Sequence, residues 1–193
     1  WKSSHRFVLL GEPGAGKTTS LSRLALLLAR DLVADPASGR PIPVFVELKT
    51  CSSHPGGRVV DKVARELGGE VEAAPTLLTQ NLLLLLDGLN EVRTSERKAV
   101  RDEIEELLRQ FPGVGVIVST RREGYSSEIP LPTYSLLSLG DEEIRQFLGR
   151  EISPPERGAA VATRMEHDAK TWDICRNPWW LSIVTELVRD DDT

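Results

Sequence analysis

The stretch of sequence that decides the fold spans residues 6–19 and reads RFVLLGEPGAGKTT. From Gly11 to Thr18 it matches the pattern G-x-x-x-x-G-K-[ST] at every fixed position. A short apolar run, residues 6–10, precedes the pattern, and a Leu- and Ala-rich run without Gly or Pro, residues 18–33, follows it. We therefore predict a buried strand, a phosphate-binding loop and a helix in that order, which is the context that this motif requires.

The residue types in this loop suit a bound chain of phosphates. Glycines let the backbone bend so that successive N–H groups point at phosphate oxygens, and the following helix presents its positive end to the same anion. Lys17 can reach the β- and γ-phosphates, and the Thr18 hydroxyl is placed to ligate Mg²⁺. The nucleotide-binding residues that we predict here are Gly11, Glu12, Pro13, Gly14, Ala15, Gly16, Lys17, Thr18 and Thr19.

An acidic segment follows a second apolar run, residues 81–86, which is apolar on both faces like a central parallel strand. A carboxylate at the end of such a strand, here Asp87, is costly without a partner. We expect the P-loop strand to be the neighbouring strand in the sheet, so that a Mg²⁺ ion held beside it is the partner of Asp87. We predict that Asp87 contacts the metal directly or through water, and that Glu91 orients or deprotonates the attacking water. The alternative is that Asp87 only starts a turn and Glu91 caps a helix.

A third strand end carries arginine. Residues 113–119 (GVGVIVS) are predicted as a strand, and Arg121 follows it closely. Because ligands of parallel sheets collect at the carboxyl ends of the strands, we predict that Arg121 lies near the γ-phosphate and senses it through its fork of donors. A solvated surface arginine is the alternative, and Arg122 takes the role if the register is shifted by one residue.

The remaining patterns give the domain organisation. Strands at residues 43–48 and 134–137 alternate with helices at 59–67 and 95–111, which predicts a three-layer α/β fold with a mainly parallel sheet over residues 1–138. After that point only helical patterns occur, at 141–149 with Asp141 as N-cap, at 156–170 and at 179–188. We predict a helical lid subdomain over residues 139–193. Because the chain begins at Trp1, we expect it to be a piece of a longer protein that cuts this lid short.

Composition narrows the classes of function. The net charge is -5, from 24 Lys+Arg and 29 Asp+Glu, which argues against a surface that wraps nucleic acid. No apolar stretch is long enough to span a bilayer, and the two cysteines have no metal-ligand spacing, so we expect reduced thiols in a cytoplasmic protein. We expect no ligand cluster among the histidines, and core packing in preference to base stacking for two neighbouring tryptophans. These residues are Cys51 and Cys175, His5, His54 and His167, and Trp179 and Trp180.

Six segments together resemble the NACHT family of STAND-class NTPases, which are relatives of the AAA+ ATPases. GEPGAGKTT resembles the family's Walker A motif, PVFVELK its second strand, LLLLLDGLNEV its extended Walker B motif and VIVSTRREGY its sensor-1 strand with Arg121. YSLLSLGDEEIRQFL is similar to the entry into the helical subdomain. NPWWLSIVTEL is similar to the segment whose proline, here Pro178, lies against the nucleotide base. The resemblance covers nearly the whole chain.

This resemblance implies a regulatory switch that is closed with ADP and self-associates with ATP. It also implies an effector module on one side and a winged helix with a sensor region beyond, in a protein of signalling or defence. The chain departs from the family at Asn90, where an acid is common, and it holds no counterpart of the winged-helix histidine.

The combined expectation is a module that binds Mg·ATP, hydrolyses it slowly and acts as a conformational switch. One alternative is an interaction scaffold that holds ADP with negligible turnover, and another is a motor-like AAA+ or DNA-handling ATPase. A GTPase is less favoured because no N-K-x-D motif is present in the sequence. A small-molecule kinase would need an acceptor site that the sequence does not indicate.

Overall fold

A computed structural model describes residues 5–127 and 129–190 of the chain. Trp1, on which the expectation of a longer parent protein rests, lies outside the described residues. Contacts between Cα atoms divide the chain into two compact units. The first holds Trp1–Glu12 and Lys17–Ser135, and the second holds Pro13–Gly16 and Leu136–Thr193. Each unit has a hydrophobic core of its own.

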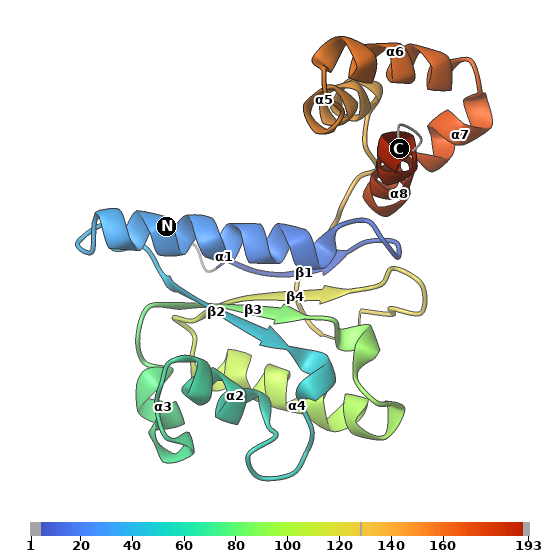
Figure 1. Cartoon of the computed structure of the whole chain (residues 1–193). Coiled ribbons are helices and arrows are strands. Elements are labelled where there is room, and N and C mark those ends of the chain that lie inside the picture. Colours follow the sequence, from blue (N-terminus) through green and yellow to red (C-terminus); the bar gives the residue numbers. More distant parts are fainter. Residues whose placement is uncertain (1–4, 128, 191–193) are drawn as a thin grey trace. The chain divides into compact units, whose positions relative to one another are not determined.

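The first unit is built on a five-stranded sheet in the order β2-β3-β4-β1-β5. Every strand pair in it is parallel, and Figure 1 shows the strands running side by side. The predicted α/β fold with a parallel sheet is thereby confirmed. The strands are β1 (Arg6–Leu10), β2 (Ile42–Glu47), β3 (Leu82–Asp87), β4 (Gly115–Thr120) and β5 (Thr133–Ser135).

The position of β4 corrects one expectation. We expected the strand that leads to Asp87 to lie next to the P-loop strand, but β4 lies between β3 and β1. The physical reason is visible in β4 itself, because all of its residues are buried and it therefore needs a neighbour on each side and a cover on each face. The parallel register pairs Leu86 with Val118 and Leu10 with Thr120, so the three strands end at the same edge.

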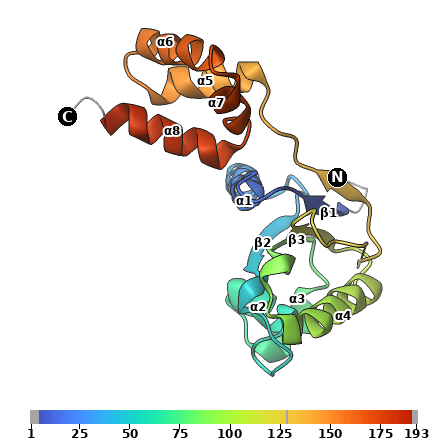
Figure 2. The same cartoon turned by 90° about the vertical axis from the view of Figure 1, so that its right-hand side faces the viewer.

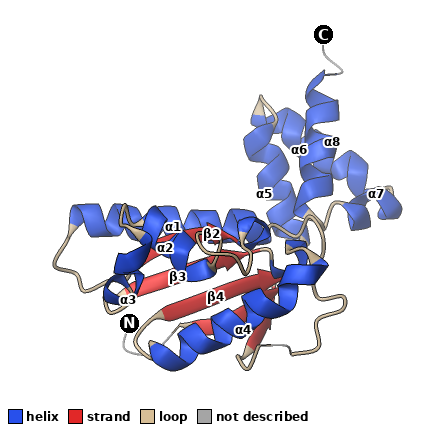
Figure 3. Ribbon diagram, turned by 90° about the horizontal axis from the view of Figure 1, so that it is seen from below, coloured by secondary structure: helices blue, strands red, loops and turns tan. Residues whose placement is uncertain are grey.

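Helices cover both faces of this sheet. Helix α1 (Lys17–Ala34) lies on one face, and α2 (Val59–Glu66), α3 (Ala74–Leu77) and α4 (Thr94–Gln110) lie on the other, as the two views in Figures 1 and 2 show. Seen from below in Figure 3, α4 lies alongside β4 and follows the direction of the strands. Three short 3-10 turns complete the unit, η1 (Leu48–Thr50), η2 (Val71–Ala73) and η3 (Leu89–Glu91). The sequence reading missed η2 and α3 because both are much shorter than the window over which a hydrophobic period can be recognised.

The alternation along β3 explains how one strand serves two cores. Successive side chains of a strand point to opposite faces. Leu83 and Leu85 therefore pack with Leu21 and Leu28 of α1 and with Ile117 of β4. The other leucines of β3 join the core beneath α4, whose buried members include Leu84, Leu86, Val100, Ile104 and Leu107.

The second unit contains four helices around its own core. They are α5 (Asp141–Glu151), α6 (Pro155–Glu166), α7 (Ala169–Ile174) and α8 (Pro178–Asp190). The helix predicted over residues 156–170 is in fact two helices. Asp168 separates them, because its carboxylate accepts hydrogen bonds from the backbone N–H of Lys170, at 3.2 Å, and from the Thr171 hydroxyl, at 2.6 Å, and so begins α7.

Two further expectations about this unit were wrong. Gly140, not Asp141, is the N-cap of α5, and the Asp141 carboxylate instead accepts from Trp172 Nε1 at 3.1 Å and from Arg176 at 2.7 Å. Trp179 and Trp180 are 53% and 45% exposed, so they do not fill the core. The buried tryptophan is Trp172, whose indole N–H reaches a carboxylate that satisfies it.

Arg6 ties the first strand to the end of α4. Its guanidinium donates to the carbonyl oxygens of Leu108 and Val114, both at 2.9 Å, and to that of Phe111. Burial lowers the pKa of Arg6, which is consistent with a partly desolvated cation held by main-chain acceptors.

We predict that Arg6→Ala lowers the free energy of unfolding by about 1–3 kcal/mol, because partly buried carbonyl groups lose their donor. Urea denaturation followed by circular dichroism measures this change. Arg109→Ala is the matched control. Arg109 lies on α4, the helix whose end Arg6 contacts, and it forms an exposed pair with Glu106. Equal midpoints for the two variants would contradict the anchoring role of Arg6.

Candidate functional site

The predicted site residues of the first unit converge at the carboxyl edge of the sheet. Gly11 follows β1 directly, Asp87 is the last residue of β3, and Arg121 follows the last residue of β4. Lys17 and Thr18 open α1 at the same edge. The first turn of α1 contains no acidic residue, so no carboxylate of the helix itself offsets its positive end.

The loop before α1 has a backbone that only glycine adopts easily. Gly14 and Gly16 have φ angles of +74° and +86°, in the left-handed region. The chain then curves back, and Lys17 Nζ donates to the carbonyl oxygens of Gly11 at 2.8 Å and Glu12 at 3.0 Å. The ammonium group therefore lies over the loop, which is where a phosphate chain would meet it.

Several ionised groups at this edge influence the pKa of Lys17. Burial lowers the pKa of Lys17, and the positive charge of Arg121 lowers it further. The carboxylates of Asp87, Glu12 and Glu91 act in the opposite direction. Lys17, Arg121 and the three acids thus lie within electrostatic range of one another.

Asp87 uses both of its carboxylate oxygens. Oδ2 accepts from the Thr18 hydroxyl at 2.7 Å, and Oδ1 accepts from the Ser119 hydroxyl. Ser119 was missed by the sequence reading. The signal for it was a hydroxyl residue near the end of an otherwise apolar strand, GVIVST, where a buried polar group requires a hydrogen-bond partner.

The turn after Asp87 depends on Gly88. Its φ angle is +81°, and a Cβ atom at this position would lie 3.2 Å from Cδ of Glu91, so the Glu91 carboxyl group folds back over the glycine. Glu91 does not cap α4, because the N-cap residue of that helix is Arg93. The alternative of a helix cap is therefore wrong, and Glu91 is an exposed carboxylate in the turn that follows Asp87.

Asn90 links this turn to the end of β4. Its side-chain Oδ1 accepts from the backbone N–H of Arg121 at 3.1 Å, and its backbone oxygen accepts from Arg97 Nη2 at 3.0 Å. Asn90, which stands where the family commonly has an acid, thus still provides a side-chain oxygen that accepts a hydrogen bond. Arg121 and Arg122 are both exposed, and Arg122 Nε is 3.9 Å from a carboxylate oxygen of Glu12.

The end of β2 adds two charged residues that the sequence reading did not assign to the site. Glu47 pairs with Asp87 in the register of β2 and β3, and Lys49 Nζ is 3.0 Å from the Glu47 carboxylate. The hydrogen bond to Glu47 raises the pKa of Lys49, and the charges of Glu91 and Asp87 add to this effect.

Pro178 lies in the second unit, which also contains Pro13–Gly16. It is the first residue of α8 and follows Asn177, whose side-chain amide donates to the carbonyl oxygen of Pro13 at 2.8 Å. A Cβ atom on Gly14 would lie 2.7 Å from Asn177 Oδ1 and 2.8 Å from Cβ of Trp179. Within this unit, therefore, the start of α8 leaves no room for a side chain at Gly14.

The oxygen atoms of Thr18 and Asp87 fit a magnesium ion. Mg²⁺ prefers hard oxygen ligands and is usually held by one or two carboxylates together with phosphates of the substrate. Among the described residues no group of three or more His, Cys, Asp or Glu side chains is arranged to hold a metal ion. A hydroxyl and one carboxylate match the smaller protein contribution that Mg²⁺ needs beside a nucleotide.

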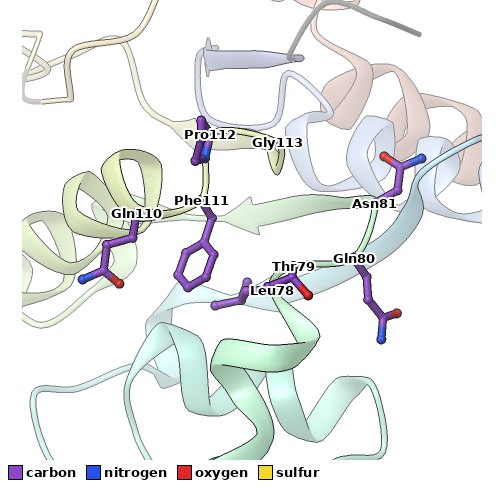
Figure 4. A pocket seen from close by; sticks show the side chains of 8 residues that line it. All are labelled: Leu78, Thr79, Gln80, Asn81, Gln110, Phe111, Pro112 and Gly113. Carbon is purple, nitrogen blue, oxygen red and sulfur yellow. The ribbon is translucent and has the colours of Figure 1, made fainter.

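A hollow at the opposite edge of the sheet does not share this chemistry. Figure 4 shows this cavity of about 410 Å³, where α3 leads into β3 and α4 leads into β4. None of its lining residues carries a charge, so it offers no group suited to phosphate or metal. The lining residues are Leu78, Thr79, Gln80, Asn81, Gln110, Phe111, Pro112 and Gly113.

The sequence matches the NACHT domain family over residues 5–154, which is most of the chain. The chain belongs to the NACHT domain family. This NACHT domain is a nucleotide-binding NTPase module with a P-loop fold. In the part of the chain that the structure describes, no helix has both the length and the apolar character needed to cross a membrane.

A solved structure of RuvB supports this fold. A variant of RuvB from Thermotoga maritima is 17% identical, with a TM-score of 0.54, and the match covers 96% of this chain and 54% of that chain. C. elegans PCH-2 is also 17% identical, with a TM-score of 0.48, and the match covers 81% of this chain and 41% of that chain. This NACHT domain thus spans about half the length of these two chains. No curated protein sequence matches the chain.

The contact between Asn90 and Arg121 generates a prediction. Asn90→Asp keeps an oxygen acceptor for the Arg121 N–H, so we expect only a modest change in the rate of ATP turnover. Asn90→Ala removes the acceptor, and we expect turnover to fall by about tenfold, as for the loss of one hydrogen bond of ordinary net strength. Steady-state phosphate release measures both rates, and an Ala variant as active as the Asp variant would show that the contact is dispensable.

Proposed function

We propose that this NACHT domain binds Mg·ATP, hydrolyses it slowly and uses the difference between ATP and ADP as a conformational switch. The observation that carries the proposal is the convergence of the P-loop with Asp87, in which the Thr18 hydroxyl donates to Asp87 Oδ2 at 2.7 Å. Glu91 and Arg121 lie at the same edge of the sheet and within electrostatic range of Lys17. The site therefore combines groups suited to phosphate, metal and water.

Each group at this edge has a role under the proposal. The residues Gly11 to Thr19 bind the phosphates through backbone N–H groups and the Lys17 ammonium. Thr18 and Asp87 hold the Mg²⁺ ion, which neutralises charge on the phosphate oxygens. Arg121 senses the γ-phosphate, because its guanidinium is always charged and offers several donors to oxygen.

Hydrolysis is assigned to Glu91. It is an exposed carboxylate in the turn that follows Asp87, and its neighbour Asn90 has no charge and cannot act as a base. A carboxylate at this position can orient the attacking water and accept its proton.

The wider organisation rests on the family. We propose that residues 1–138 form the nucleotide-binding domain and residues 139–193 a helical lid whose Pro178 contacts the adenine base. In the parent protein, effector and sensor modules would flank the domain, and the ATP-bound form would self-associate. A cytoplasmic signalling or defence protein is the setting that fits this organisation.

The first prediction from this proposal concerns binding. Mg·ATP or ADP should raise the melting temperature of the protein, because a ligand that binds only the native state stabilises it. Lys17→Ala should remove most of this shift, since the loop loses its mobile positive charge. Differential scanning fluorimetry measures the shift with and without nucleotide.

Lys98→Ala is the matched control for this experiment. Lys98 is an exposed lysine that pairs with Asp102 on α4, so its removal should leave the nucleotide shift intact. A full shift in Lys17→Ala would refute the phosphate-binding role of that lysine. In a competition binding experiment, tighter binding of GTP or GDP than of ATP or ADP would refute the choice of adenine.

The second prediction separates a slow ATPase from an inert holder of ADP. Glu91→Gln should keep ATP binding but lower single-turnover hydrolysis by about a hundredfold to ten-thousandfold, the usual contribution of a general base. Glu105→Gln is the control, because Glu105 is a partly exposed carboxylate on α4 whose charged partner is Arg101. If Glu91→Gln leaves the rate unchanged, Glu91 is not the base and the scaffold function gains support.

A further inference from the structure

Ser119 is a buried polar residue that the proposed chemistry does not use. It has no exposed surface and is the residue before the last one of β4. Its hydroxyl donates to Asp87 Oδ1 and accepts from the backbone N–H of Gly88 at 2.9 Å. A hydroxyl group has one proton to donate, and here that proton goes to the carboxylate.

The register of the sheet explains why these residues meet. Leu85 pairs with Ile117 and Leu86 with Val118, so the next pair along the two strands is Asp87 and Ser119. Leu85 and Ile117 both belong to the core beneath α1. Side chains alternate between the two faces of a sheet, so Asp87 and Ser119, two residues further along their strands, project to the same face. This is the face on which α1 begins.

The contacts of Ser119 determine how Asp87 is presented. With Oδ1 occupied by Ser119, the other oxygen, Oδ2, is turned toward the hydroxyl of Thr18. The contact with the Gly88 N–H fixes the point where the backbone enters the left-handed conformation and turns toward Glu91. A single side chain therefore sets both the orientation of the carboxylate and the start of the turn.

We propose that Ser119 is the positioning residue for the magnesium side of this site. It does not touch nucleotide or metal, because it is fully buried, and it acts through Asp87. The inference rests on the proposed role of Asp87 in holding Mg²⁺. Partners that hydrogen-bond to metal ligands commonly raise metal affinity by about 10- to 100-fold.

The test compares Ser119→Ala with the parent chain. The affinity for ATP is measured with a fluorescent analogue, first in EDTA and then across a series of Mg²⁺ concentrations. The Mg²⁺ concentration that gives half-maximal ATP turnover is measured in parallel. We expect Ser119→Ala to raise that concentration by about 10- to 100-fold. The affinity for ATP in EDTA should stay at the parent value, because Ser119 supports the metal side alone.

A matched control removes another buried hydroxyl. Thr185 is 2% exposed in α8, and its hydroxyl donates to the carbonyl oxygen of Leu181 in the same helix at 2.7 Å. Thr185→Val should change the melting temperature but not the Mg²⁺ requirement. If Ser119→Ala does not fold, Ser119→Cys keeps the shape of the side chain with a somewhat larger atom and a weaker donor, and it should shift the Mg²⁺ requirement in the same direction.

The outcomes distinguish the two proposals. A parent chain without Mg²⁺-dependent ATP binding overturns the proposed function and the role of Ser119 together. If the parent binds and the Ser119 variant that folds keeps the parent's Mg²⁺ requirement, only the positioning role is overturned. Equal losses of ATP affinity with and without Mg²⁺ would also overturn it, because they would assign Ser119 a merely structural role.

Discussion

The geometry of the site depends on the hydrogen bond from Thr18 to Asp87. This bond joins the start of α1, which follows β1, to the last residue of β3, and these two strands are not adjacent in the sheet. Because β4 lies between β1 and β3, the P-loop reaches Asp87 only if α1 crosses over β4. The core beneath α1 fixes this crossing, since Leu21 and Leu28 pack against Leu85 and Ile117 of the two strands below. Apolar packing on one face of the sheet thus places a hydroxyl against a carboxylate at its edge.

The parts of the fold that local patterns encode were predictable from the sequence, and the spatial order of the strands was not. The strand, loop and helix around Lys17 follow from fixed residue types, because Gly14 and Gly16 supply backbone angles that other residues avoid. Periodicity shows that a strand is covered on both faces, but it does not identify the neighbouring strands. The break at Asp168 was missed for a similar reason, because a helical period continues across a residue whose carboxylate caps the next helix.

In the candidate site, charged residues at strand ends were easier to predict than their neutral partners. Lys17, Asp87, Glu91 and Arg121 are conspicuous because charge next to an apolar strand needs an explanation. Ser119 carries no charge, and its contact with Asp87 depends on the register between β3 and β4, which the sequence does not specify.

Electrostatics gives the proposed switch a physical basis. Burial lowers the pKa of Lys17 and the repelling charge of Arg121 lowers it further, whereas the carboxylates of the same edge act in the opposite direction. A phosphate group between them would replace this repulsion with attraction to both. The γ-phosphate is the group that reaches Arg121 under the proposed function, and ADP lacks it. Under the proposed function, ATP would therefore stabilise the arrangement in which β4 and the P-loop present both cations, whereas ADP would leave Arg121 without that partner.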